Sequence, residues 1–361
     1  MHYYTFSSFA YSLVVFILIS IPFTNSRFNN TTVVQLETLT TYPFPTVISD
    51  AIWHSKDSLL LTFTTPAELQ SITPNAIADP KNPDNKAAYQ ILHSFDEQAC
   101  GGIAYLGNDK YLLVTSNLQV FPKTNPAPGT HSLYIINLEA WTEGTKGVVV
   151  NKLVGLPEAK WLISIVPLPK SKNSTRKFPL VLISDAMAGS ILQFDPDTKQ
   201  SATWFTHPSM QPSPKADVPV GINGLRYFNG YVYYTNTFAH SLYRLAVCDD
   251  SWTPNGKPEL MIQDPEFPHG ANFEIQKAPG VPQLYVTGSN RVVKVAMVDG
   301  GRWTWTDIAG GANDTIVAGA TSAVKGRVGL KEKMWVVTGG SLLSPWIKGF
   351  REGGKVVRMD I

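Results

Sequence analysis

Residues 221–237 carry the strongest local structural signal in this chain. Strand-forming residues flank Asn229-Gly230 on both sides, and Asn-Gly is the dipeptide most typical of a tight hairpin turn. The first strand of this hairpin opens on Asn223, which is flanked by glycines, and the second ends at Asn236. Leu242–Leu245 follows and predicts a third strand. The segment therefore predicts a small antiparallel unit with polar residues at its strand ends.

Variants of this unit recur along the chain. Each has a strand that opens on a small or polar residue, a turn, a second strand, a loop and a third strand. The six units begin at Ser49, Cys100, Trp161, Gly221, Pro268 and Gly319. Repeats of about 40 to 60 residues with three or four strands each are typical of a β-propeller. We predict an all-β fold, a six-bladed β-propeller, with the strand Val33–Leu39 closing the last blade. A large β-sandwich is the alternative.

The composition agrees with a large folded core and excludes one class of partner. Hydrophobic residues make up 43% of the 361 residues and charged residues only 16%, which disfavours disorder. The net charge is +2, and lysine and arginine form no cluster. Nucleic-acid binding therefore has no electrostatic support.

The N-terminus resembles a secretory signal peptide. A short apolar run, Leu13–Ile21, is followed by small residues up to Ser26. This predicts a signal peptide at residues 1–26 and a single propeller domain at 27–361. The run is too short for a stable membrane span, although a signal anchor is the alternative because the first residues lack a positive charge. The glycosylation triplets at Asn29, Asn30, Asn173 and Asn313 fit passage through the secretory pathway.

The chain has two cysteines, Cys100 and Cys248. A secretory compartment would permit a disulfide between them. Two buried free thiols are the alternative, and the spacing of the two residues leaves both open.

One face of the ring is expected to carry the functional residues. In a propeller, the inner strand of each blade starts at this face, and the loop between the second and third strands lies there too. Expected near the mouth are Asp50, Gly102, Ser164, Asn223, His269 and Ser322. Expected to flank it are Thr64, Asn117, Asp185, Asn236, Asn290 and Ser341. The loop Ser341–Lys355 carries Pro345-Trp346-Ile347, an apolar patch suited to covering a pocket.

Three of these residues are the candidate catalytic groups. His269 titrates near neutral pH and could protonate a leaving hydroxyl, or it could pack inside the ring. Asn223 suits orienting a polar ligand or a structural water. Asp50 could act as a base or, like Asp185, cap a turn. The candidate substrate-binding residues are Trp53, Asn117, Asp185, Asn236, Phe273, Ser322 and Trp346, with a core position as the alternative for Trp53 and Phe273.

Short motifs resemble the superfamily of gluconolactonases and senescence marker protein, together with strictosidine synthase-like propellers. They are Ile222-Asn223-Gly224-Leu225, the strand end at Asn236 and Pro268-His269-Gly270. The resemblance implies a divalent cation held by a glutamate, an asparagine and an aspartate. Asn223 matches the asparagine, but His269 replaces the aspartate, and no glutamate precedes Trp53. We therefore predict no metal site of the calcium type.

The whole-chain pattern is also similar to fungal propellers encoded with biosynthetic enzymes, among them hetero-Diels–Alderases of tropolone–sesquiterpene pathways. Shared features are the leader, Asp50-Ala51-Ile52-Trp53, Asn223-Gly224-Leu225, and Thr321-Ser322 before Gly326-Arg327. No catalytic motif of that group is matched, so no residue role is transferred. The resemblance implies a cofactor-free cycloaddition of an ortho-quinone methide with an apolar terpene alkene. A metal-dependent lactonase and a non-catalytic propeller that binds small molecules are the alternatives.

Overall fold

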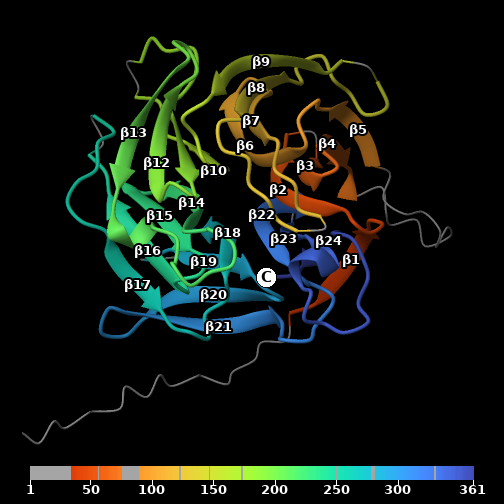
Figure 1. Ribbon diagram of the computed structural model, residues 1–361, viewed down its shortest axis with the longest axis vertical. Helices are drawn as coiled ribbons and strands as arrows, with labels where there is room; N and C mark the ends of the chain where they lie inside the picture. The colour runs from red at the N-terminus through yellow and green to blue at the C-terminus, as the bar shows by residue number, and fades with distance from the viewer. Residues whose placement is uncertain are drawn as a thin grey trace, which may run out of the picture. The chain divides into compact units, whose positions relative to one another are not determined.

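The fold is a six-bladed β-propeller built from six four-stranded antiparallel sheets (Figure 1). The computed structural model describes residues 34–361 except 56, 75–88, 122, 146, 172–173, 249–250, 278–280 and 329–330. The expected signal peptide and the triplets at Asn29, Asn30 and Asn173 lie outside the described residues. In the described part of the chain, no helix has the length and apolar character needed to cross a membrane.

Each sheet forms one blade. Blade 1 contains β2 (Val47–His54), β3 (Ser58–Thr65), β4 (Glu68–Ile72) and β5 (Tyr89–Ser94). Blade 2 contains β6 (Ala99–Gly107), β7 (Lys110–Ser116), β8 (His131–Asn137) and β9 (Val149–Leu156). Blade 3 contains β10 (Leu162–Pro167), β11 (Val181–Asp185), β12 (Ser190–Asp195) and β13 (Gln200–Thr206), followed by the short 3₁₀ helix η2 (Pro208–Met210).

The second half of the ring repeats this order. Blade 4 contains β14 (Ile222–Phe228), β15 (Tyr231–Asn236), β16 (Ser241–Ala246) and β17 (Glu259–Gln263). Blade 5 contains β18 (Gly270–Gln276), β19 (Gln283–Gly288), β20 (Arg291–Val298) and β21 (Arg302–Gly310). Blade 6 contains β22 (Ala320–Val328), β23 (Lys331–Thr338) and β24 (Lys355–Met359), with the 3₁₀ helix η3 (Gly340–Leu343) between the last two.

The ring closes through the strand β1 (Leu36–Thr41), which pairs with β24 as the outermost strand of blade 6 (Figure 1). Leu36 lies opposite Met359, and Thr41 lies opposite Lys355. The closing strand expected at Val33–Leu39 is thus present, with its start and end shifted toward the C-terminus. Pairing the two ends of the chain in one sheet completes blade 6 and closes the ring.

The hairpin predicted at Asn229-Gly230 is confirmed. Both residues have positive φ, 49° and 79°, as a two-residue turn of the primed type requires. Phe228 pairs with Tyr231 at its base. Glycine tolerates this backbone without strain, and asparagine is the residue that tolerates it next best.

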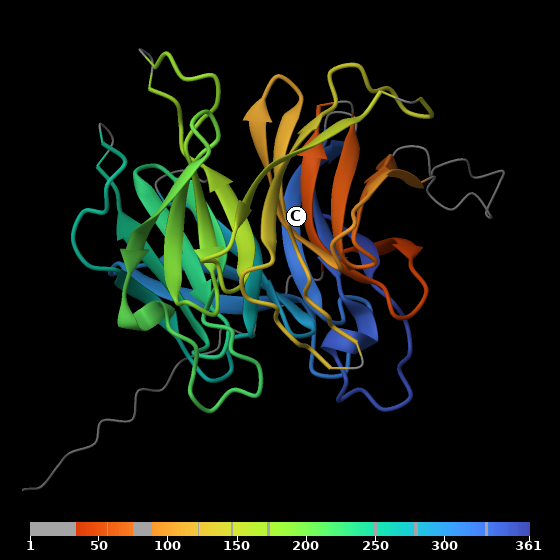
Figure 2. The same cartoon turned by 45° about the horizontal axis from the view of Figure 1, so that its top comes forward.

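Among the described residues, the hydrophobic core has one cluster between each pair of neighbouring blades. A seventh, smaller cluster includes Ala99, Trp161 and Val220. In the cluster between blades 4 and 5, Tyr233 and Leu242 pack against Phe273 and Val286. Burying one such side chain contributes about 1.5 to 3 kcal/mol. The sheets therefore stand face to face around the centre, with loops at both ends (Figure 2).

The six inner strands form a closed ring, because each of β2, β6, β10, β14, β18 and β22 contacts the next. Near its start, every one of them has a register shift against its partner strand. Such bulges bend a strand and turn its side chains. They place the polar residues of the strand starts, such as Asp50 and Ser322, toward neighbouring blades.

Near these bulges, hydroxyl groups of second strands form hydrogen bonds to the inner strands of the next blades. Thr62 donates a hydrogen bond to the carbonyl of Gly101 at 2.6 Å, and Ser184 donates to the carbonyl of Asn223 at 2.7 Å. Thr235 donates to the carbonyl of Ala271 at 2.8 Å. These bonds satisfy carbonyl groups that the bulges leave out of the ladder.

Candidate pocket between blades 4, 5 and 6

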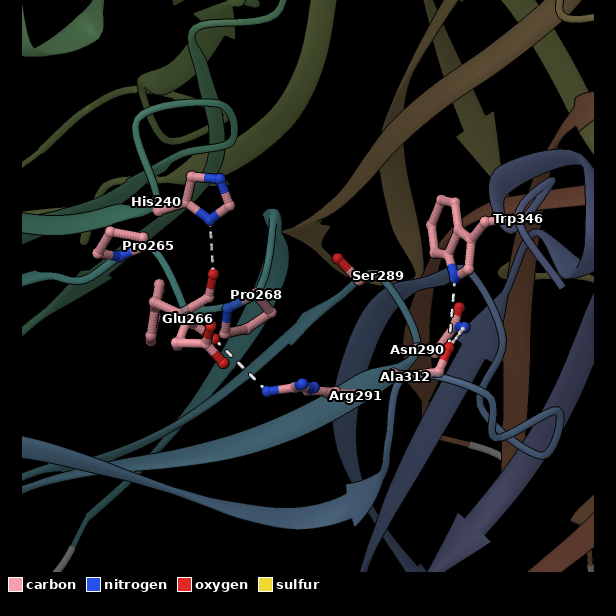
Figure 3. Close-up of a pocket in the computed structure, with 10 residues that line it drawn as sticks. His240, Pro265, Glu266, Pro268, Ser289, Asn290, Arg291, Ala312 and Trp346 are labelled. Atoms are coloured by element: carbon pink, nitrogen blue, oxygen red, sulfur yellow. Dashed lines mark hydrogen bonds between the residues drawn. The ribbon is translucent and has the colours of Figure 1, made fainter. Parts of the chain in front are cut away.

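A pocket of about 240 Å³ lies at the face where the inner strands begin (Figure 3). Its walls come from the loops that connect second to third strands and fourth to inner strands. The lining residues are His240, Pro265, Glu266, Phe267, Pro268, Ser289, Asn290, Arg291, Ala312 and Trp346. The loop Ser341–Lys355, expected to cover a pocket, contributes Trp346.

The lining of the pocket mixes apolar and polar groups. Pro265, Pro268 and the indole of Trp346 supply carbon surface, and Trp346 is 49% exposed. The indole N–H donates to the carbonyl of Ala312 at 3.3 Å, which orients the ring. His240 and Arg291 supply polar groups (Figure 3). Such a mixed lining suits a small ring compound with one polar end.

The guanidinium of Arg291 is held in place at the pocket wall. It donates to the carbonyl of Glu266 at 3.5 Å and lies 3.7 Å from the carboxylate of Asp307. A guanidinium has five N–H groups. Arg291 therefore has donors left for a ligand oxygen.

His269 lies behind the pocket wall and does not line it. Its Nδ1 is 3.3 Å from the hydroxyl of Ser289, and its ring is 4.5 Å from the ring of His240 and 5.2 Å from that of Phe238. Burial lowers the pKa of His269, and the neighbouring His240 lowers it further. His269 is therefore neutral at pH 7, which argues against an acid role there.

His240, which the sequence analysis did not select, is the histidine of the pocket. It lies in the loop between β15 and β16. The sequence did indicate its position, because loops between second and third strands were expected at the mouth of the ring. The sequence favoured His269 instead, because His269 lies in the motif that opens an inner strand.

Asp50 is buried at the centre of the ring and already has several partners. Its Oδ1 accepts hydrogen bonds from Ser322 at 2.6 Å, from Asn272 at 3.0 Å and from its neighbour Ala51 N–H at 2.9 Å. Its Oδ2 accepts from the N–H of Ile103 at 3.4 Å. The carboxylate thus connects blades 1, 2, 5 and 6, and Ser322 is fully buried beside it.

Three other polar candidates are also used by the scaffold. The amide of Asn223 donates to Thr237 at 3.0 Å. The carboxylate of Asp185 accepts from the N–H groups of Lys160, Trp161 and Ala188. Asn236 donates to the carbonyls of Ser209 and Gln211 and accepts from the N–H of Ala239. Asp185 therefore caps a turn, the alternative that the sequence left open.

The remaining candidates lie apart from the pocket. Phe273 is fully buried in the core between blades 4 and 5, and Trp53 stacks on Trp335 with ring centroids 5.9 Å apart. Asn117 is exposed, and its backbone N–H donates a hydrogen bond to Thr130 Oγ1. Of the ten candidates, only Trp346 lines the pocket, while Asp50 and Ser322 meet at the centre of the ring.

The residues do not fit a divalent cation of the calcium type. Within the described ranges, no group of three histidine, cysteine, aspartate or glutamate side chains could hold an ion. Hard cations need several oxygen ligands with open lone pairs, and Asp50 has no second carboxylate beside it. Cys100 and Cys248 are both free, and burial raises the pKa of the Cys100 thiol.

Comparisons with known proteins support the fold alone. No family model matches the chain, and no curated protein matches it in sequence. Luciferin-regenerating enzyme has a similar structure, with a TM-score of 0.60, 13% identity, and coverage of 91% of this chain and 95% of that one. The major allergen Mala s 1 of Malassezia sympodialis has a TM-score of 0.55 and 9% identity, with coverage of 91% of this chain and 95% of the allergen. An auxiliary nutrient binding protein of Bacteroides ovatus has a TM-score of 0.54 and 10% identity, with coverage of 92% of this chain and 74% of that protein.

Proposed function

We propose that the protein is an enzyme that binds a small ring compound in the pocket between blades 4, 5 and 6. The observation that carries the proposal is a lining that combines the carbon surface of Trp346 and two prolines with the polar groups of His240, Ser289 and Arg291. The reaction is the one implied by the sequence resemblance, a cycloaddition of an ortho-quinone methide with an apolar alkene. A quinone methide has a flat apolar ring and one polar carbonyl, and this matches the lining.

The pocket would act by positioning and by hydrogen bonding. A volume of about 240 Å³ suits one small ring compound, so the alkene would lie at the rim, against the exposed indole of Trp346. Holding two partners in a reactive pose removes a large part of the entropic barrier. A hydrogen bond from Arg291 to the quinone methide oxygen would withdraw electron density and speed addition of an electron-rich alkene.

The experiment uses an ortho-hydroxymethyl tropolone as precursor and a cyclic terpene alkene as partner. We expect the protein to accelerate formation of one stereoisomer of the adduct. Trp346→Ala should slow the reaction roughly tenfold, because the aromatic contact of the alkene is worth about 1 kcal/mol or somewhat more. Tyr89→Ala is the control, because Tyr89 is equally exposed but lies on β5, the outermost strand of blade 1. Chiral chromatography measures rate and stereochemistry together.

Two other outcomes would overturn the proposal. The reaction is expected to survive exhaustive chelation, because the residues do not fit a calcium site. Hydrolysis of a lactone that is lost in EDTA and restored by calcium would instead identify a metal-dependent lactonase. Saturable binding of the precursor with an unchanged adduct rate and racemic product would identify a binding propeller without catalysis.

We also propose that the protein passes through the secretory pathway. The support is the apolar N-terminal run and the triplet at Asn313, which is exposed on a turn between β21 and β22. Secreted material is expected to begin near residue 27 and to lose mass at Asn313 on treatment with an N-glycosidase. Secreted protein that still begins at Met1 would contradict the processing step.

A further inference from the structure

We propose that His240 is the catalytic base of this pocket and that it takes the proton of a substrate hydroxyl on its Nε2 atom. This proposal rests on the proposed function and names the residue that begins the reaction. His240 lines the pocket, whereas His269 lies behind the wall. Four features of the structure support the assignment.

The first feature is the tautomer of His240. Its Nδ1 lies 2.7 Å from the carbonyl oxygen of Phe267. A carbonyl oxygen only accepts hydrogen bonds, so Nδ1 must carry the proton and donate it. In the neutral ring, Nε2 then has the free lone pair. A fixed Nδ1–H with a basic Nε2 is the arrangement that an imidazole needs to act as a base.

The second feature is the backbone that holds the ring. His240 has a φ of 48°, in the left-handed region that few residues other than glycine and asparagine adopt. Its carbonyl accepts a hydrogen bond from the N–H of Asp264 at 3.2 Å. Together with the bond from the His240 ring to Phe267, this ties the loop before β16 to the loop before β18. The strained backbone is thus held from two sides, and the ring has a defined orientation.

The third feature is the neighbouring imidazole. The rings of His240 and His269 are 4.5 Å apart. Two positive rings at this distance would repel each other. Because His269 is half-buried and neutral, a proton taken up by His240 meets no second positive charge there. The other charged groups near the pocket are Glu266, Asp264 and Arg291.

The fourth feature is the wall opposite His240. Ser289 and Arg291 lie on the turn after β19 and at the start of β20, and both can donate hydrogen bonds to a ligand oxygen. His240 can accept a proton while they stabilise the negative charge that proton removal creates. Figure 3 shows the three side chains around the pocket.

The step that follows is a 1,4-elimination of water from the precursor. His240 Nε2 removes the proton of the ring hydroxyl, and the electron pair of that O–H bond forms the ring carbonyl. The ring electrons shift toward the exocyclic carbon, and its bond to the hydroxymethyl oxygen breaks. The departing hydroxide takes the proton back from His240 and leaves as water. The products are the quinone methide and water, and neutral imidazole is regenerated, so no co-reactant is needed.

The test separates water loss from cycloaddition. His240→Asn is the chosen variant because asparagine tolerates the left-handed backbone and its amide can still donate to Phe267, but it cannot accept a proton. Adduct formation from the hydroxymethyl precursor is expected to fall about a hundredfold or more, the usual contribution of a general base. With the quinone methide generated photochemically in the same mixture, the loss of rate in His240→Asn should be much smaller than with the precursor, because no proton has to be removed from the substrate.

Each result bears on a different proposal. Wild-type turnover of the precursor by folded His240→Asn would overturn the role of His240 and leave the cycloaddition intact. Loss of both the precursor reaction and the reaction of the photochemical quinone methide would show that His240 only shapes the pocket. No acceleration of either reaction by the wild type would remove the proposed function itself. His93→Gln, on the outer strand β5, is the control for loss of an imidazole elsewhere. If His240→Asn fails to fold, His240→Gly keeps the backbone and added imidazole should restore precursor turnover.

Discussion

Replacing Gly224 by alanine is expected to lower the free energy of unfolding by about 3 kcal/mol, near the upper end for overpacked sites. Gly224 lies in the bulge of the inner strand β14, against the inner strand of the next blade. A β-carbon at this position would collide with the carbonyl oxygen of Ala271 and lie only 2.9 Å from the α-carbon of Asn272. Both contacts are backbone atoms, which cannot turn aside as a flexible side chain can. The blade would have to move.

Gly155→Ala is the matched control for this experiment. Gly155 also lies in a strand, β9, but the nearest atom to an added β-carbon is the carbonyl oxygen of His131 at 4.0 Å. We expect this variant to match or slightly exceed the wild type, because alanine restricts the unfolded chain more than glycine does. Chemical denaturation measures both. Equal stability of the two variants would show that the packing of β14 on β18 is looser than the structure indicates.

Acidification from pH 6.5 to about 4 is expected to destabilise the protein through His131 by about 3 kcal/mol. His131 is 2% exposed, and its Nε2 accepts a hydrogen bond from the N–H of Leu162 at 3.1 Å, between blades 2 and 3. Burial lowers the pKa of His131 from 6.5 to about 4, against an opposing effect of Asp185. Between these two values the unfolded chain binds the proton and the folded protein does not, so stability falls as the pH falls. Above pH 6.5 the effect vanishes.

His131→Gln tests this expectation. The side-chain oxygen of glutamine can accept the bond from Leu162, but it does not titrate. The free energy of unfolding of this variant should depend less on pH between 6.5 and 4 than that of the wild type. His207→Gln, at the start of the short helix η2, removes a histidine without changing this interface and should keep the wild-type slope. Parallel curves for the wild type and His131→Gln would show that another group controls acid unfolding.

Local sequence patterns were sufficient for the architecture. The Asn229-Gly230 turn, the recurrence of strand units and the closing strand all follow from short-range chemistry, since turn residues and strand periodicity act within a few residues. The first five units nevertheless acquired a fourth strand in the structure, such as β5 and β9, which are rich in exposed residues. Their patterns are weak because only one side of an outer strand is buried.

The blades also share a hydroxyl residue at one position of the repeat. The second strand of each blade carries a buried hydroxyl residue in its last four residues: Thr62, Thr115, Ser184, Thr235, Thr287 and Thr338. In three blades this hydroxyl donates to the carbonyl of the next inner strand. The repeat is thus also a repeat of contacts between blades, which a pattern of strands alone does not reveal.

The sequence by itself determined the blade count, the turn chemistry and which loops lie at the face where the inner strands begin. Only the tertiary structure decided which polar residues remain available to a ligand. Asn223 and Asp50 look like site residues in the sequence, but the folded ring supplies each of them with hydrogen-bond partners. Asn223 bonds to Thr237, and Asp50 bonds to Asn272 and Ser322. His240 and Trp346 belong to loops more than a hundred residues apart and meet at one pocket only when blades 4, 5 and 6 pack together. The hydrogen-bonding capacity of a side chain is used up by its neighbours in space, and neighbours in space are set by packing between blades.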